Sequence, residues 1–153
     1  MAQELSEQTR TLVRSKINGY EDLSQEDQLR SAIKVIAKDF HIYCERNLMI
    51  QDKVSGTIVS FELNWAQELL VDRVLADIAK GVPVRYIILK ARQMGLSTII
   101  EALGYWWTTT HKNIKAVIIA HETEASGNLY NMFKRYFDNS HPHFQPTRKY
   151  NTK

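Results

Sequence analysis

The stretch KARQMGLST, residues 90–98, combines residue types that can hold a phosphate group and a metal ion. It follows the apolar run from Tyr86 to Leu89 and precedes a second apolar segment. A loop between a strand and a helix binds phosphate because backbone N–H groups and the positive end of the helix dipole face it. A lysine then neutralises the phosphates and a hydroxyl binds Mg²⁺. The pattern therefore predicts a phosphate-binding loop.

The loop departs from the usual pattern G-x-x-x-x-G-K-[ST] at its lysine. If Gly95 is the second glycine, Lys90 takes the first glycine position and Leu96 the lysine position. Ser97 then supplies the metal-binding hydroxyl. A lysine at the end of a strand can curl over the same cavity, so we expect Lys90 to neutralise the phosphates, with Arg92 as a second cation. The alternative is a tight turn with an exposed lysine.

The whole chain has the length of one domain. It has 153 residues, with 20 Lys and Arg against 17 Asp and Glu, and the net charge of +3 is too small to indicate nucleic acid as a partner. Its one cysteine, Cys44, permits no internal disulfide, and the polar amino terminus has no apolar core of a signal or anchor. We expect a soluble intracellular protein.

The first third of the chain is expected to be helical and to lead into a hairpin. Residues 3–17 are compatible with a helix, and Asn18-Gly19-Tyr20 ends it. A second helix should begin after Ser24 and run to about Asn47, since its apolar residues recur at three- and four-residue spacing. Residues 48–63 contain short β-like stretches, which predicts a hairpin or a pair of edge strands.

The following segments alternate between helix and strand, which is typical of a parallel sheet with right-handed crossovers. The predicted segments are a helix over 64–81, a buried strand over 84–89, a helix from 95 to about 109, a buried strand over 116–120 and a helix over 122–137. The predicted fold class is α/β, with a partial parallel sheet of the P-loop NTPase type. The predicted domains are a helical segment over 1–47, a partial P-loop ATPase domain over 48–138 and an irregular tail over 139–153.

Three stretches resemble one protein family. ILKARQMGLST resembles the ATPase loop of the large terminase subunit of tailed bacteriophages, in which an R-Q-x-G segment ends in Ser-Thr or Thr-Thr and lysine can occupy the first position. FELNWAQELL resembles the terminase segment whose glutamine reads adenine, which places that role on Gln67. AVIIAHETEASGNLYNMFKRY resembles the strand and helix after the loop. The resemblance covers about residues 40–138.

This resemblance implies a site for ATP and Mg²⁺. Gln67 would contact adenine, while Lys90 and the backbone of 91–95 would hold the phosphates. Ser97, with Thr98 adjacent, would bind Mg²⁺. Arg92 would be catalytic, stabilising charge on the transferred phosphoryl group. The complete set of implied nucleotide-binding residues is Gln67, Lys90, Ala91, Arg92, Gln93, Met94, Gly95, Leu96, Ser97 and Thr98.

The resemblance also implies a biological role. It implies a motor ATPase that packages viral DNA in the cytoplasm of the infected bacterial host. Its partners would be double-stranded viral DNA, the portal protein, the small terminase subunit and further copies of itself, with no membrane. The sequence departs from the family because it has neither an apolar run ending in Asp-Glu nor the carboxylate cluster of the nuclease domain. We therefore interpret it as the first part of a terminase large subunit.

Two other interpretations stay open. One is a truncated or decayed terminase fragment without catalysis, acting as a nucleotide-binding or interaction module. The other is a helicase-like motor, although such loops keep the lysine that Leu96 replaces. Three further groups of residues are more simply explained by structure than by function. Tyr105-Trp106-Trp107 should pack on the sheet rather than stack on a ligand, and Cys44 should be buried. His141 and His143 should belong to a solvated tail rather than bind zinc.

Overall fold

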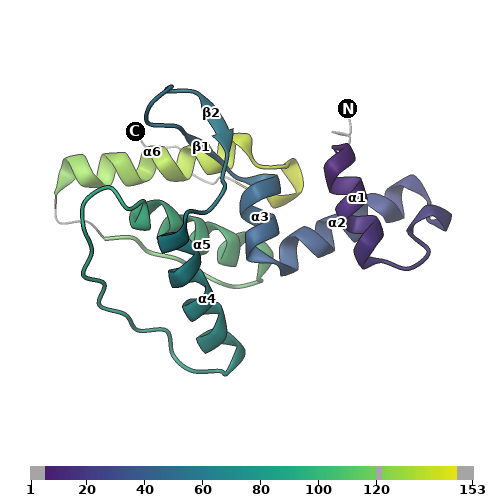
Figure 1. The fold of residues 1–153 in the computed structure, drawn as a ribbon, viewed down its shortest axis with the longest axis horizontal. Helices are drawn as coiled ribbons and strands as arrows, with labels where there is room; N and C mark the ends of the chain where they lie inside the picture. The colour runs from purple at the N-terminus through teal and green to yellow at the C-terminus, as the bar shows by residue number, and fades with distance from the viewer. Residues whose placement is uncertain (1–5, 120–121, 148–153) are drawn as a thin grey trace.

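The computed structural model describes residues 6–119 and 122–147. The fold is mixed α/β and predominantly helical, and the described residues form one antiparallel sheet of two strands. Figure 1 shows an arm made by α1 and α2 beside a larger body in which the other helices gather around α5. The elements are α1 (Glu7–Lys16), η1 (Tyr20–Asp22), α2 (Gln25–Lys38), α3 (Phe40–Asn47), β1 (Met49–Gln51), β2 (Ile58–Ser60), α4 (Trp65–Ala79), α5 (Leu96–Thr110), α6 (Thr123–Asn139) and η2 (Pro142–Phe144).

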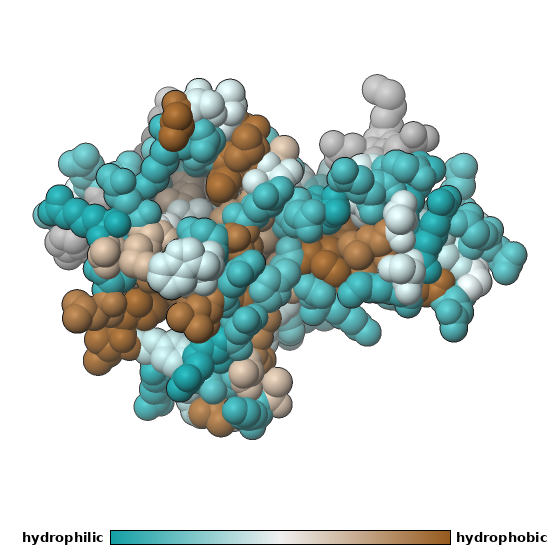
Figure 2. Space-filling model, in the orientation of Figure 1, coloured by the Kyte–Doolittle hydropathy of each residue, from teal (hydrophilic) through white to brown (hydrophobic). Residues whose placement is uncertain are grey.

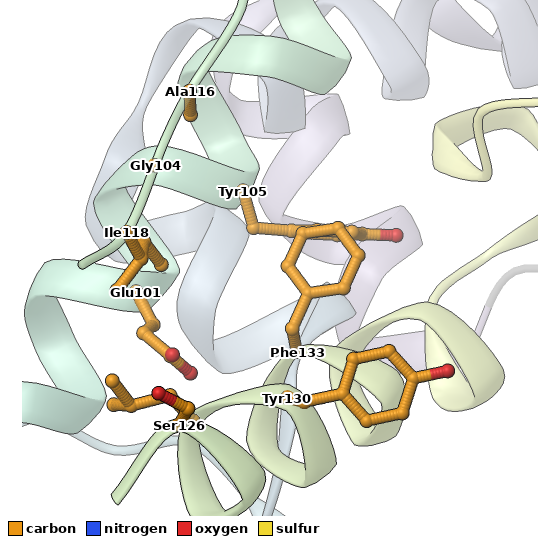
Figure 3. Close-up of a pocket in the computed structure, with 9 residues that line it drawn as sticks. Glu101, Gly104, Tyr105, Ala116, Ile118, Ser126, Tyr130 and Phe133 are labelled. Carbon is orange, nitrogen blue, oxygen red and sulfur yellow. The ribbon is translucent and has the colours of Figure 1, made fainter. Parts of the chain in front are cut away.

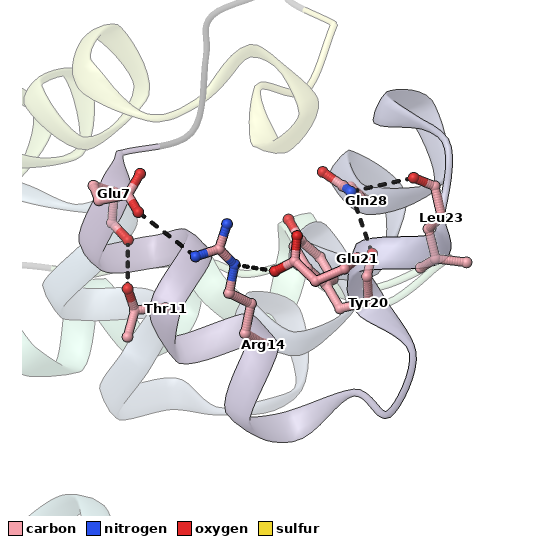
Figure 4. Close-up of polar contacts among 7 residues, drawn as sticks. All are labelled: Glu7, Thr11, Arg14, Tyr20, Glu21, Leu23 and Gln28. Atoms are coloured by element: carbon pink, nitrogen blue, oxygen red, sulfur yellow. Dashed lines mark hydrogen bonds and ion pairs between the residues drawn. The ribbon is translucent and has the colours of Figure 1, made fainter.

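The arm has a small apolar core of its own. Val13 of α1 and Tyr20 of η1 are buried against α2. Polar contacts close the turn between these elements: Arg14 forms an ion pair with Glu21, and the side-chain amide of Gln28 donates to the carbonyl of Tyr20 at 3.2 Å (Figure 4). Because exposed ion pairs contribute little to stability, the buried side chains hold the arm together.

The helix predicted from Ser24 to about Asn47 is two helices. Ser24 does cap α2, accepting from the backbone N–H of Asp27 at 3.2 Å, as predicted. The chain then turns extended at Asp39, whose carboxylate accepts from the N–H of Ile42 at 3.2 Å and begins α3. An aspartate that caps a new helix competes with continuation of the old one, which explains why the single-helix prediction was wrong.

The predicted hairpin is confirmed. In the β1–β2 pair, Ile50 lies opposite Val59 in an antiparallel register. Asp52 organises the turn, because its carboxylate accepts from the backbone N–H of Ser55 at 2.7 Å and from the Ser55 hydroxyl at 2.8 Å. These hydrogen bonds lower the pKa of Asp52, since they favour its charged form.

The main core surrounds α5. Tyr105 and Trp106 are buried there, and the Trp106 indole donates to the carbonyl of Ala37 at 2.8 Å. Their predicted packing role is confirmed, although the partners are helices and not a sheet. Cys44 is also buried, as predicted, and burial raises the pKa of its thiol. This core crosses the domain boundary predicted at position 47, because Phe40 on one side of it packs against Trp106 on the other, with ring centroids 5.2 Å apart.

The two segments predicted as buried strands, 84–89 and 116–120, are neither paired nor buried where the structure describes them. Residues 84–89 and 116–119 run without helix or strand hydrogen bonding, and residue 120 lies outside the described part. Their outward side chains are exposed, with Ile87 at 103% and Val117 at 82% relative exposure. Figure 1 shows the first run as a long unpaired segment between α4 and α5, and Figure 2 shows hydrophobic side chains on that side of the molecule. A strand exists only with a neighbour, and no described segment pairs with either run.

The predicted irregular tail is partly packed. Within residues 139–147, η2 forms at Pro142–Phe144 and Phe144 is buried against Tyr43, with ring centroids 5.1 Å apart. The Tyr105 hydroxyl donates to the carbonyl of Phe144 at 3.2 Å. Residues 148–153 lie outside the described part. Among the described helices, none combines the length and apolar character needed to cross a bilayer.

Candidate functional site

The loop over 90–95 leads into α5 as predicted. Gly95 is the N-cap of α5 and has φ 68° and ψ 14°, a left-handed conformation that glycine adopts without a steric cost. Gln93 also has a positive φ of 64°. Since glycine has no side chain to cap a helix, the first N–H groups of α5 are left for water or a ligand. A phosphate-binding loop also needs a helix start whose backbone donors have no side-chain cap.

The Gln67 side chain links this loop to the start of α4 through hydrogen bonds. Its amide nitrogen donates to the Gly95 carbonyl at 2.9 Å, and its amide oxygen accepts from the backbone N–H of Asn64 at 3.0 Å. Asn64 in turn accepts from the N–H of Gln67, which completes a capping box at the start of α4. Only 4% of Gln67 is exposed. The side chain predicted to read adenine therefore lies beside the loop, with both ends of its amide already hydrogen-bonded to protein.

A cavity of about 710 Å³ opens between the hairpin, the start of α4, the loop and α6. We call it the amide cavity, because Asn and Gln are the most frequent residue types in its lining. Four of the predicted site residues line it, namely Gln67, Gln93, Gly95 and Thr98. Its size lies within the range of small-ligand and cofactor sites, roughly 300 to 1,000 Å³.

The remaining predicted residues do not line this cavity. Lys90, Ala91, Arg92 and Ser97 are exposed, and Met94 is half-buried. Leu96 is buried in the core, in line with a packing role at the helix start. The hydroxyl at the cavity is thus that of Thr98, not that of Ser97. The structure brings the glycine, the glutamine and one hydroxyl together, but it leaves both loop cations outside.

Sequence reasoning missed the contribution of α6. Asn128, Asn131 and Arg135 all line the amide cavity. Arg135 donates to the side-chain oxygen of Gln51 at 3.0 Å, which holds the guanidinium beside the hairpin. The spacing of these three residues, i, i+3 and i+7, places them on one helical face, and that periodicity of polar residues was the available signal. Lys53 of the hairpin turn adds a second cation to the lining.

The cavity offers mixed chemistry. Its amides can both donate to and accept from a heterocyclic base, while Arg135 and Lys53 can pair with phosphate oxygens. Asp52 and Glu62 add negative charge to the same lining. Among the described residues no three His, Cys, Asp or Glu side chains gather closely enough to form a metal site by themselves.

Comparison of the chain with protein-family models, curated proteins and solved structures finds no match in any of the three.

Proposed function

We propose that this chain is the ATP-binding portion of a phage terminase large subunit, the motor ATPase that drives viral DNA packaging. The observation that carries the proposal is the left-handed Gly95 at the amino end of α5, tied to Gln67 and facing the amide cavity. A helix that starts at a glycine leaves backbone donors and the positive dipole end directed at one place, where phosphates are stabilised.

The ligand in this proposal is ATP with Mg²⁺. Ser97 and Thr98 lie two and three positions after Gly95, and their hydroxyls would hold Mg²⁺ beside the phosphates. Lys90 and Arg92 are exposed on the loop, so their long side chains are free to reach a bound nucleotide. Arg135 lines the cavity and would supply a positive charge for the phosphates. The proposed partners are viral double-stranded DNA, the portal protein, the small terminase subunit and other copies of the chain, in the host cytoplasm.

The parallel P-loop sheet also belongs to the proposal. Residues 84–89 and 114–119 flank α5 on either side in sequence and are both extended. Their exposure alternates, with Tyr86 at 38% and Ile87 at 103% in the first run. A period of two is the pattern of a strand with one face packed. In the proposed fold these runs become parallel strands on either side of the crossover helix α5.

Binding of Mg-ATP to the whole chain tests the proposal. Titration with a fluorescent ATP analogue should saturate, and Lys90→Ala should weaken binding about 10- to 100-fold, because a hydrogen bond to a charged group is worth about 1.5 to 3 kcal/mol. Lys112→Ala is the matched control, since this exposed lysine follows the other end of α5. Absence of saturable binding would refute an ATP site. Equal loss in the two variants would show that Lys90 has no specific role.

The second candidate function is an interaction module without catalysis. The observation that favours it is the apolar character of the two extended runs, in which Leu89 is 101% and Ile119 is 89% exposed. Exposed, unpaired apolar backbone is a template for strand addition by another chain. Strong hydrogen-exchange protection of both runs on mixing with a partner, without any Mg-ATP binding, would favour this candidate.

A further inference from the structure

A second, smaller cavity lies between α5, α6 and the extended run 114–119. Its volume is about 260 Å³, and none of its lining residues lines the amide cavity. Glu101 and Tyr105 of α5 face Tyr130 and Phe133 of α6 across it, with Ile118 along one side (Figure 3). We call it the Glu101 cavity.

Glu101 is the unusual side chain of this cavity. It is 2% exposed, and neither of its carboxylate oxygens has a hydrogen-bond partner among the described residues. Figure 3 shows the carboxylate directed between α5 and α6, toward Ser126. The Ser126 hydroxyl donates elsewhere, to the carbonyl of Glu122 at 3.1 Å. A buried carboxylate without donors is costly, so a group that supplies donors here would be bound with a net gain.

The remaining walls are apolar and aromatic. The hydroxyl of Tyr105 is engaged away from Glu101, with Ser140 at 2.7 Å. The Tyr130 hydroxyl also points away from the carboxylate, while its ring and that of Phe133 line the cavity (Figure 3). The cavity therefore presents one anionic acceptor and several aromatic surfaces, and aromatic faces attract cations.

We propose that the Glu101 cavity binds a small organic ammonium ion, with the ammonium group on the Glu101 carboxylate and the hydrocarbon part against Tyr130 and Phe133. An ammonium has three donors for the two unpaired oxygens, and a charge-assisted hydrogen bond is stronger than one from a neutral donor. An anion would be repelled by the same carboxylate. The volume suits a single amine of about ten non-hydrogen atoms or a lysine side chain, and is below the usual size for a nucleotide.

Calorimetric titration of the whole chain with benzylammonium chloride tests this site. At pH 8 binding should saturate at one equivalent, and benzyl alcohol, the neutral analogue of similar shape, should bind at least 10-fold more weakly. Glu101→Gln should weaken benzylammonium binding at least 10-fold. Glu124→Gln is the matched control, because this exposed carboxylate on the first turn of α6 is not part of the cavity lining. Equal binding of the amine and the alcohol, or no effect of Glu101→Gln, would overturn the proposal.

A second variant keeps the test decisive if Glu101→Gln does not fold. Tyr130 is 49% exposed, so Tyr130→Ala should fold normally and weaken benzylammonium about 2- to 5-fold through loss of one aromatic wall. Unchanged affinity in Tyr130→Ala would contradict the proposed position of the hydrocarbon part. Titration with a blocked lysine, N-acetyl-lysine methylamide, distinguishes the source of the cation. An affinity equal to that of benzylammonium indicates a lysine side chain of another protein as the ligand, and a much lower affinity indicates a free amine.

The pH dependence provides an independent readout. Burial raises the pKa of Glu101 to about 7, so the carboxylate is charged at pH 8 and largely neutral at pH 6. The other titratable groups around it are the phenols of Tyr105, Tyr130 and Tyr136 and the exposed Lys115 on the neighbouring run. Benzylammonium affinity should therefore rise between pH 6 and pH 8. A flat profile would show that Glu101 does not hold the cation.

Discussion

Replacement of Gly95 by alanine tests the link between the loop and α4. A Cβ added at Gly95 would lie 2.6 Å from the amide nitrogen of Gln67, well inside contact distance. Alanine would also have to adopt φ +68°, which costs about 1 to 2 kcal/mol for a residue with a Cβ. To escape the clash, Gln67 has to give up its hydrogen bonds to Gly95 and Asn64, each worth about 1 kcal/mol. We expect Gly95→Ala to lower the free energy of unfolding by about 2 to 4 kcal/mol.

Gly81→Ala is the matched control. Gly81 has nearly the same backbone conformation, with φ +69°, but a Cβ there would meet no atom within 4 Å. Its loss should be the conformational cost alone, about 1 to 2 kcal/mol. Urea unfolding followed by tryptophan fluorescence measures both variants. The excess loss in Gly95→Ala is the contribution of the Gln67 contact.

A double-mutant cycle isolates that contact. In a Gln67→Ala background the clash is absent, so Gly95→Ala should cost no more than Gly81→Ala. If Gly95→Ala and Gly81→Ala are equally destabilising in the wild-type background, Gln67 does not constrain the loop and the reasoning is refuted. Equal destabilisation would also mean that the Gln67 amide is available to a ligand, as its predicted adenine role requires.

Three further predictions follow from burial, capping and exposure. Burial raises the pKa of Glu101 from 4.5 to about 7, so the folded state binds this proton more tightly than the unfolded state does. The free energy of unfolding should therefore fall by about 2 to 3 kcal/mol as pH rises from about 4.5 to about 7. Urea titrations at pH 5 and pH 8 should show this loss in the wild-type chain and not in Glu101→Gln. Asn64→Ala should cost about 1 kcal/mol in the same assay, because it removes the N-cap of α4, while Glu68→Ala on the exposed side of the first turn should cost less than about 0.5. We expect the exposed apolar runs to make the chain self-associate, so Ile87→Lys combined with Val117→Lys should reduce concentration-dependent association in analytical ultracentrifugation; unchanged association would show that the runs are not its cause.

Local signals in the sequence predicted the helices and the hairpin well. Ser24 and Asn64 are capping residues whose effect depends on neighbours three positions away, so the starts of α2 and α4 could be located from the sequence. Gly95 likewise marked the start of α5. The break at Asp39 was missed because the apolar spacing runs through it without interruption, and only the observed cap shows that a new helix begins there.

The sheet could not be predicted in the same way, because a strand depends on a partner as much as on its own residues. Residues 84–89 are rich in the side chains that strands prefer, yet the described chain provides no neighbour for them. The candidate site shows a similar division. Gln67 and Gly95 were found from short patterns, whereas Arg135 reached the same cavity through the packing of α6 on the hairpin; the spacing of polar residues on α6 marks their shared face but does not specify what that face packs against.

The packing of η2 onto the core has a consequence for how the chain folds. The side-chain oxygen of Asn47 accepts from the backbone N–H of His141 at 2.8 Å, across 94 positions of sequence, and Phe144 closes over Tyr43. Contacts between residues so far apart in sequence form late, since the loop between them must first be closed at an entropic cost. During synthesis, α3 leaves the ribosome long before the residues that cover Tyr43. Until then its aromatic surface is open to water, and a chaperone or another nascent chain can compete for it.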